Sequence, residues 1–199
     1  MLRWLCLAVV LTLAGVWQQW GTRGVSHPPG VLVSADPVQL QLTAGTDPPL
    51  FRKQDADIRA LARFEMRARA LGVERYRFDA MAKLAPVDIA FGWGPMSDSR
   101  VLARLSIAQG NRFYHWSTAD FPIPRREIET HSANMHLIAA DPLVERRIGE
   151  TRPGQVVTLS GYLVEVKAAS GWTIRSSLTR EDTGAGACEV IWVESFELE

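Results

Sequence analysis

The sequence has little cysteine and no excess of charge of either sign. Only two of its 199 residues are cysteine, which excludes a disulfide-dense scaffold and a cysteine-rich zinc module. Lysine and arginine together number 22, as do aspartate and glutamate, so the formal net charge is zero. A dedicated nucleic-acid-binding protein usually carries a clear basic excess, so nucleic acid is a disfavoured partner.

Several functional signatures are also missing. The sequence has no Gly-x-x-x-x-Gly-Lys phosphate loop, no Gly-x-Ser-x-Gly nucleophile turn, no internal repeat and no cofactor motif. Hydrophobic residues make up 47% of the chain and charged residues 22%, which excludes intrinsic disorder for most of it. The length suits one domain with a tether.

The N-terminus carries the longest uncharged apolar run. After Arg3, residues 4–17 have no charge, and residues 2–20 reach the length of a membrane-spanning helix if the Arg3 side chain extends to the interface. Tryptophans stand at both ends of this run, as in the aromatic belts of membrane helices. We expect residues 1–20 to be an uncleaved signal-anchor helix, with a cleaved signal peptide as the alternative.

The charges beside this run predict an orientation. Arg3 precedes the run and only Arg23 follows it closely, which favours an N-terminus in the cytoplasm. The body would then lie in the periplasm of a bacterium, tethered to the inner membrane by a single-pass helix. Residues 21–30 have the glycine, proline and serine content of a linker, which leaves residues 31–199 as an extracytoplasmic domain.

Hydrophobic periodicity predicts a β-rich body. From Ile58 to Leu71 every even-numbered residue is apolar and most odd-numbered residues are charged. A period of two predicts a half-buried strand, although alanine, arginine and methionine favour a helix. Further strands are expected at 86–93, 112–116 and 134–139, and short helices after the capping residues Asp98 and Asp141.

The C-terminal residues 154–199 contain three strand-like stretches, at 155–166, 172–178 and 187–196. Turns between them predict a β meander or a small barrel. Gly161 inside the first stretch resembles the glycines that let strands coil in oligonucleotide-binding barrels, which is an analogy of fold alone. The expected fold class is therefore α+β, rich in β, with one mixed domain after the membrane helix.

Charge is distributed unevenly along the chain. Residues 52–77 hold eight basic and four acidic side chains, whereas residues 181–199 hold six acidic side chains and no basic one. We expect these two regions to pair with each other within the fold, in preference to forming a ligand groove.

Three motifs carry a family resemblance: GWGPMSD at 92–98, HSANMH at 131–136 and SSLTREDTGAGACEV at 176–190. They resemble a family of small bacterial proteins with one N-terminal transmembrane segment, whose members are uncharacterised. The resemblance covers roughly residues 55–196. It implies a location in the bacterial envelope and brings no activity, cofactor or catalytic residue with it.

The same motifs contain the candidates for a binding site. Trp93 lies in a Gly-Trp-Gly-Pro turn, where it would be either an aromatic platform beside a cleft or a core side chain. Ser176, Ser177 and Arg180 lie in a segment dense in hydroxyl groups that could hold a phosphate or a carboxylate.

A hydrolase is a second hypothesis, with His131, His136, Asp98 and Asp182 as candidate catalytic residues. The spacing of five between the histidines suits neither a helical nor a strand pair of metal ligands, so no metal site is predicted. Cys188 has apolar neighbours and is expected to be an inert buried thiol.

The sequence as a whole favours a binding function over an enzymatic one. We expect a membrane-tethered envelope protein that binds a protein partner or an anionic ligand and needs no cofactor. The envelope hydrolase and an oligonucleotide-binding module are the alternatives.

Overall fold

The structure is a computed structural model and describes residues 24–43, 45, 47–182 and 187–199. Its strands are β1 (Val38–Gln41), β2 (Leu50–Lys53), β3 (Ala56–Arg75), β4 (Val87–Gly92), β5 (Ser106–Gly110), β6 (Phe113–Ser117), β7 (Ser132–Ala139), β8 (Val156–Ala168), β9 (Thr173–Arg175) and β10 (Glu189–Leu198). Its helices are the 3₁₀ helix η1 (Gly94–Ser97) and the α-helices α2 (Ser99–Leu102), α3 (Arg125–Thr130) and α4 (Pro142–Glu150). The domain is β-rich, as expected.

The alternating segment forms β3, which confirms the strand over the helix. Every even-numbered residue from Ala56 to Ala70 is buried, and Phe64 is fully buried. A helix would have placed the charges of this segment around most of its circumference. The strand instead sends all of them to one face, so the apolar residues gain about 1.5–3 kcal/mol for each large side chain buried.

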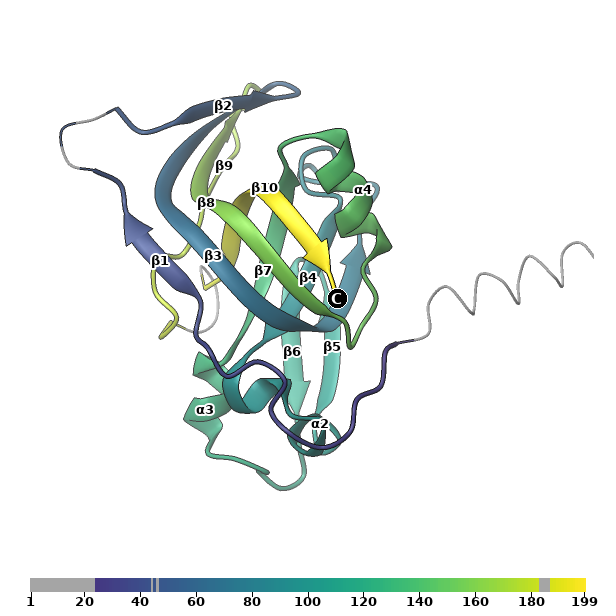
Figure 1. Cartoon of the computed structure of the whole chain (residues 1–199). Coiled ribbons are helices and arrows are strands. Elements are labelled where there is room, and N and C mark those ends of the chain that lie inside the picture. The colour runs from purple at the N-terminus through teal and green to yellow at the C-terminus, as the bar shows by residue number, and fades with distance from the viewer. Residues whose placement is uncertain (1–23, 44, 46, 183–186) are drawn as a thin grey trace, which may run out of the picture.

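Five strands, β3, β4, β7, β10 and β8, close a ring around the main core, and Figure 1 shows their arrangement. β3 pairs with β4 through its C-terminal end and with β8 along Ala56–Arg69. β4 pairs with β7, β7 with β10, and β10 with β8, which returns to β3. Only the β7–β10 pairing is parallel. β1 and β2 also pair with β3 but do not belong to the ring.

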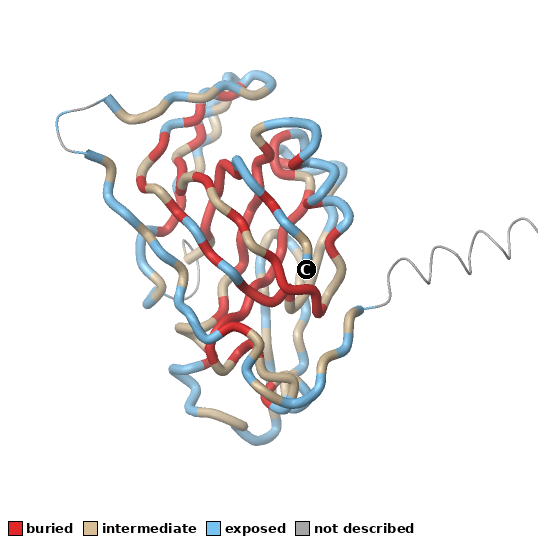
Figure 2. Tube along the Cα trace, viewed as in Figure 1, coloured by how far each residue is buried: buried red, intermediate tan, exposed pale blue. Residues whose placement is uncertain are grey.

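The interior of the ring is an apolar core, and Figure 2 shows long buried stretches along the strands of the ring. Helix α4 lies between β7 and β8 in the chain and sends Val144 and Ile148 into this core. Asp141 caps the helix, because its carboxylate accepts hydrogen bonds from the N–H groups of Leu143 and Val144 at 2.7 and 2.9 Å. The predicted cap, with Pro142 in the first turn, is confirmed.

Gly161 lies where β8 passes close to both of its neighbours. It pairs with Phe64 of β3 and with Val193 of β10, where the register of β10 shifts. A Cβ atom at Gly161 would overlap the carbonyl group of Trp192. Only glycine allows the backbones to approach this closely, so the sequence signal at Gly161 has a physical basis.

The C-terminal region does not form a meander of its own, which corrects that part of the prediction. The strand order is β9-β8-β10, and β10 inserts between β8 and β7. Glu189–Val193 of β10 are all buried, so this strand needs a neighbour on each edge and cover on each face. Residues 154–199 therefore complete a ring to which β3, β4 and β7 also belong.

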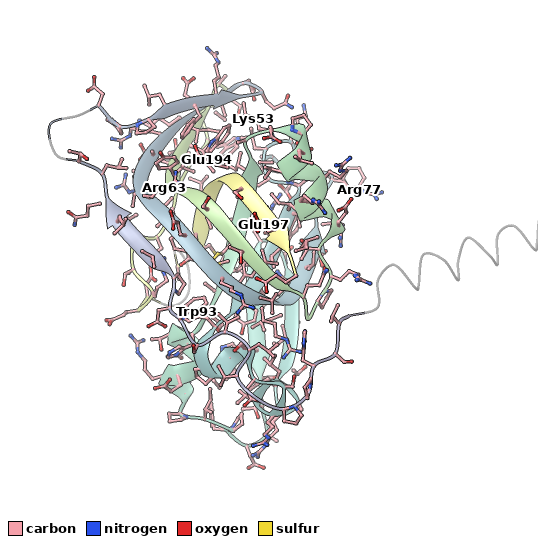
Figure 3. The ribbon with its side chains drawn as sticks, in the orientation of Figure 1. Lys53, Arg63, Arg77, Trp93, Glu194 and Glu197 are labelled. Carbon is pink, nitrogen blue, oxygen red and sulfur yellow. The ribbon has the colours of Figure 1, made fainter. Side chains whose placement is uncertain are left out.

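The predicted pairing of basic and acidic regions is confirmed. Arg63 on β3 donates to Glu194 on β10 across β8 (2.6 Å; Figure 3). Arg67 binds the side chain of Glu199 through two nitrogen atoms, at 2.9 and 2.6 Å. Exposed pairs of this kind contribute about 0–1 kcal/mol each. They also occupy the basic face of β3 with the protein's own carboxylates.

The predicted anchor, residues 1–20, lies outside the described residues. Within the described part of the chain, none of the helices has the length and apolar character needed to span a bilayer.

Residues 24–30 of the predicted linker run along the domain surface. The Val25 N–H donates to the Pro153 carbonyl at 2.7 Å, His27 Nε2 lies 2.8 Å from the Gly154 carbonyl, and the Gly30 N–H donates to Asp98 at 2.9 Å. Backbone groups that bond to the domain hold this segment in place despite its linker-like composition.

Candidate functional site: an aromatic cleft where β7 and β10 diverge

A cleft of about 530 Å³ opens at one end of the ring. β7 and β10 pair from Met135 and Glu189 onward, and the chain before Glu189 leaves the ladder. Its walls come from β6 with the segment after it, α3, the start of β7, and residues 180, 182 and 187–189 near the start of β10. The aromatic lining residues are Trp93, Phe113, Tyr114, Trp116 and Phe121; the charged ones are Arg125, Glu129, Arg180, Asp182 and Glu189.

Two of the aromatic side chains are exposed to solvent. Phe113 is 40% exposed and Phe121 53% exposed. Trp116 is half-buried, packs at one side against a small cluster beneath η1, α2 and α3, and meets Phe121 edge to face at 6.1 Å. The Arg125 guanidinium lies 6.0 Å from the centre of the Trp116 ring. Exposed aromatic rings on a supported hairpin form an unusual surface, of the kind found at binding sites.

A buried ionic network fixes the β5–β6 hairpin, which carries Phe113 and Trp116. Arg112, in the turn just before β6, has a positive φ of 68° and binds Asp79 through two nitrogen atoms, at 2.7 and 3.1 Å. Another nitrogen of Arg112 donates to the fully buried Asp88 at 2.7 Å. The same guanidinium lies 3.8 Å from the centre of the Tyr76 ring. The sequence showed only a turn here, because the acidic partners are distant in the chain.

His136 belongs to this network and not to the cleft. Its Nδ1 atom lies 2.9 Å from Asp88 Oδ1, and both residues are buried beside β4 and β7. Asn134 lies two residues before His136 on β7 and lines the cleft. It donates to the Arg112 carbonyl at 3.0 Å and accepts from Gln109 at 2.9 Å. These contacts tie β7 to both strands of the hairpin.

Trp93, labelled in Figure 3, lines the cleft but is a core side chain with 1% of its surface exposed. Of the two interpretations of the Gly-Trp-Gly turn, the core side chain fits this burial. Gly94 has a φ of +49°, and a Cβ atom there would lie 2.6 Å from the His131 ring. A Cβ atom at Gly92 would lie 2.5 Å from the Met96 carbonyl oxygen, so both glycines allow a close approach.

The hydroxyl-rich segment is folded on itself. The Ser176 hydroxyl accepts from the Val190 N–H at 3.1 Å and lies 2.8 Å from the Ser177 carbonyl. The Ser177 hydroxyl accepts from the Thr179 N–H at 3.1 Å and lies 2.7 Å from Asp182 Oδ2. Both serines are buried. Their hydroxyl groups serve the turn that brings Arg180 and Asp182 to the cleft, and they face no open anion site.

Glu189 is the most unusual polar group of the cleft. It is 1% exposed, and its Oε1 atom lies 2.9 Å from Arg180 Nε. Burial raises the pKa of the Glu189 carboxyl to about 8, and the nearby charge of Arg180 offsets only part of that effect. Among the residues that the structure describes, neither Glu189 Oε2 nor Arg180 Nε has a well-aligned hydrogen-bond partner. The contact between Glu189 and Arg180 is thus close but poorly aligned.

The proposed hydrolase residues have separate structural partners. Asp98 caps α2 by accepting from the Arg100 N–H at 2.7 Å, which confirms its predicted capping role. His131 Nδ1 lies 2.9 Å from the Glu127 carbonyl oxygen, and His136 pairs with Asp88. Of the four candidates only Asp182 lines the cleft. Within the described ranges, no three His, Cys, Asp or Glu side chains are grouped so that they could hold a metal ion.

Cys188 lines the cleft as a half-buried free thiol. Burial is the main cause that raises the pKa of its thiol to about 11, and the nearby Glu189 charge adds to it. A thiol with so high a pKa is a poor nucleophile at neutral pH, in agreement with the expected inert role.

The comparisons with known proteins add no relative to this picture. No protein-family model, curated protein or solved structure matches the chain. The function is therefore argued from the cleft itself.

Proposed function

We propose that this protein is a membrane-tethered binding module of the bacterial envelope and that the aromatic cleft is its binding site. The observation that carries the proposal is the pair of solvent-exposed rings, Phe113 and Phe121, which border a cleft of about 530 Å³ together with the half-buried Trp116. Ligand pockets in proteins have volumes of this order and combine aromatic walls with a few polar groups. The anchor at residues 1–20 and the periplasmic orientation follow from the N-terminal apolar run and its flanking charges.

The strand order supports the same site. A five-stranded ring in which the third and fifth strands are parallel, with a helix between the third and fourth, is the arrangement of oligonucleotide- and oligosaccharide-binding barrels. In such barrels the ligand lies on the second and third strands and the adjoining loops. The corresponding strands here are β4 and β7, and the cleft lies at the start of β7.

Charge in the cleft favours a neutral ligand over an anionic one. Arg125 is bonded to Glu129 at 2.7 Å, and Arg180 faces Glu189 at 2.9 Å. A nucleic acid would need a basic groove with free cations, whereas the arginines of this cleft already have acidic partners. A hydrolytic role has little support, because the candidate acids and bases are dispersed.

A site-specific crosslinking experiment tests the proposal. A photoreactive amino acid replaces Phe121 at the cleft, and in a control protein it replaces Phe78, which is 98% exposed in the loop between β3 and β4. We expect irradiated cells to give a specific adduct from position 121 in the membrane fraction and none of that mass from position 78. Identical adducts from both positions, or none from position 121, would contradict the proposal. Recovery of the intact chain in the cytosol would contradict the tether.

A further inference from the structure

We infer that the ligand of the cleft is a neutral oligosaccharide, with Trp116 and Phe121 stacking on sugar rings and the Glu189–Arg180 pair bonding to a hydroxyl group. This inference rests on the proposed binding function and names its ligand class. It is carried by two independent features of the lining: a buried polar pair that needs both a donor and an acceptor, and solvent-exposed aromatic faces beside it.

The buried pair requires a particular kind of ligand group. Glu189 Oε2 lacks a donor and Arg180 Nε lacks an aligned acceptor, counting all partners in the described part of the chain. Both residues line the cleft. Buried polar atoms without partners destabilise the fold, so a ligand that bonds to both is favoured. A hydroxyl group donates and accepts at once, whereas an ammonium group only donates and a carboxylate only accepts.

The aromatic wall fits the rest of a sugar. A pyranose ring has C–H groups on its faces and hydroxyl groups around its edge, so it can cover an aromatic ring while its edge reaches polar side chains. The exposed Phe121 ring meets the half-buried Trp116 ring edge to face, so the two rings lie at a steep angle to each other beside the cleft. Aromatic side chains provide large apolar contact at a low entropic cost, and the rigid hairpin reduces that cost further.

The charged side chains that line the cleft disfavour a polyanionic ligand and do not require a cationic one. Two arginines and three carboxylates line the cleft, and each arginine contacts one of those carboxylates. The remaining acidic side chain, Asp182, lies against the Ser177 hydroxyl at 2.7 Å. Because Glu189 is mostly protonated at neutral pH, two arginines and two carboxylates remain charged, so the lining has no net charge and a neutral chain fits best.

Titration calorimetry with the full chain tests the inference. The protein is held in a detergent without a sugar head group, and the probes are an N-acetylglucosamine hexamer and cellohexaose. We expect at least one hexaose to bind, with the Kd raised at least tenfold by Trp116→Ala and severalfold by both Phe121→Ala and Glu189→Gln. Phe78→Ala, far out in an exposed loop, should leave the Kd unchanged. Circular dichroism establishes that each variant is folded, and the exposed Phe121 provides a test even if Glu189→Gln fails to fold.

Two further probes separate this inference from the proposed function. A single-stranded thymidine 15-mer and a Lys-Ala hexapeptide are titrated in the same way. If neither hexaose binds, or if Trp116→Ala and Phe121→Ala leave binding unchanged, the saccharide inference is overturned. If the oligonucleotide or the peptide binds in a manner that depends on Trp116, the cleft remains the binding site and only the ligand class is wrong.

Discussion

Replacing Arg112 with methionine tests whether the hairpin that carries the aromatic rings is held by a buried ionic network. The change keeps an unbranched side chain and a non-glycine residue at a position with a φ of 68°. It removes the guanidinium that bonds to Asp79 at 2.7 Å and to Asp88 at 2.7 Å. Asp88 is fully buried, so its carboxylate would lose its strongest partner without gaining water.

The size of the effect follows from that burial. Removing one partner of a buried ion pair costs about 3–5 kcal/mol, since the other charge is left uncompensated. Asp79 is 37% exposed at its side chain, and His136 remains 2.9 Å from Asp88. Both facts reduce the cost, so we expect the lower end of that range, roughly 3 kcal/mol. The matched control is Arg59→Met, because Arg59 is 47% exposed and pairs with Glu165 on the surface, and we expect its cost to stay below about 1 kcal/mol.

The assay is urea-induced unfolding followed by tryptophan fluorescence. Arg112→Met should lower the midpoint well below that of both the wild type and Arg59→Met, with an unchanged dependence on urea concentration. Equal midpoints for Arg112→Met and Arg59→Met would refute the reasoning, because they would show that the network contributes no more than a surface pair.

Two other predictions concern stability. Gly161→Ala should lower the free energy of unfolding by about 1–3 kcal/mol, because the new Cβ would overlap the Trp192 carbonyl. Gly110→Ala is the control, because a Cβ atom there meets nothing within 4 Å. Equal losses of stability for the two variants in calorimetry would count against the close approach at Gly161. The pKa of the Glu189 carboxyl is raised from its ordinary value of 4.5 to about 8 in the folded protein. Between these two pH values the folded protein keeps a proton that the unfolded chain has released. Its contribution to stability should therefore fall as the pH rises from about 4.5 to about 8. Glu189→Gln should flatten this dependence in urea titrations at several pH values, and an unchanged slope would contradict the assignment.

Local signals in the sequence were sufficient for much of the fold. The alternation of β3 identifies its buried face, and Asp98 and Asp141 cap helices because an acidic side chain bonds to N–H groups two or three residues away. Local sequence patterns could not predict that the strands close into a ring. It depends on β10 inserting beside β7, which lies some fifty residues earlier in the chain, and on residues 24–30 bonding to the domain surface.

The site was harder to predict than the fold. Trp93, Ser176 and Ser177 looked like ligand groups because their motifs are polar or aromatic, yet the fold buries them in packing and turn contacts. Trp116 was expected only as part of a strand, and Phe121 carried no expectation; the tertiary structure shows that both border a cleft. The one sequence signal was the density of aromatic residues between 113 and 121. It does not show which rings reach solvent.

Hydroxyl-radical footprinting in intact cells tests the central claim most directly, because it detects an occupied cleft whatever the chemical identity of the ligand. Oxidation of Phe121 and Trp116 is compared with that of Phe78 in cells and in the purified full chain. Occupancy of the cleft predicts that Phe121 and Trp116 are oxidised more slowly in cells than in the purified protein, while the ratio for Phe78 stays unchanged. Equal oxidation of the cleft residues under both conditions would contradict the claim that this cleft binds a ligand in the envelope.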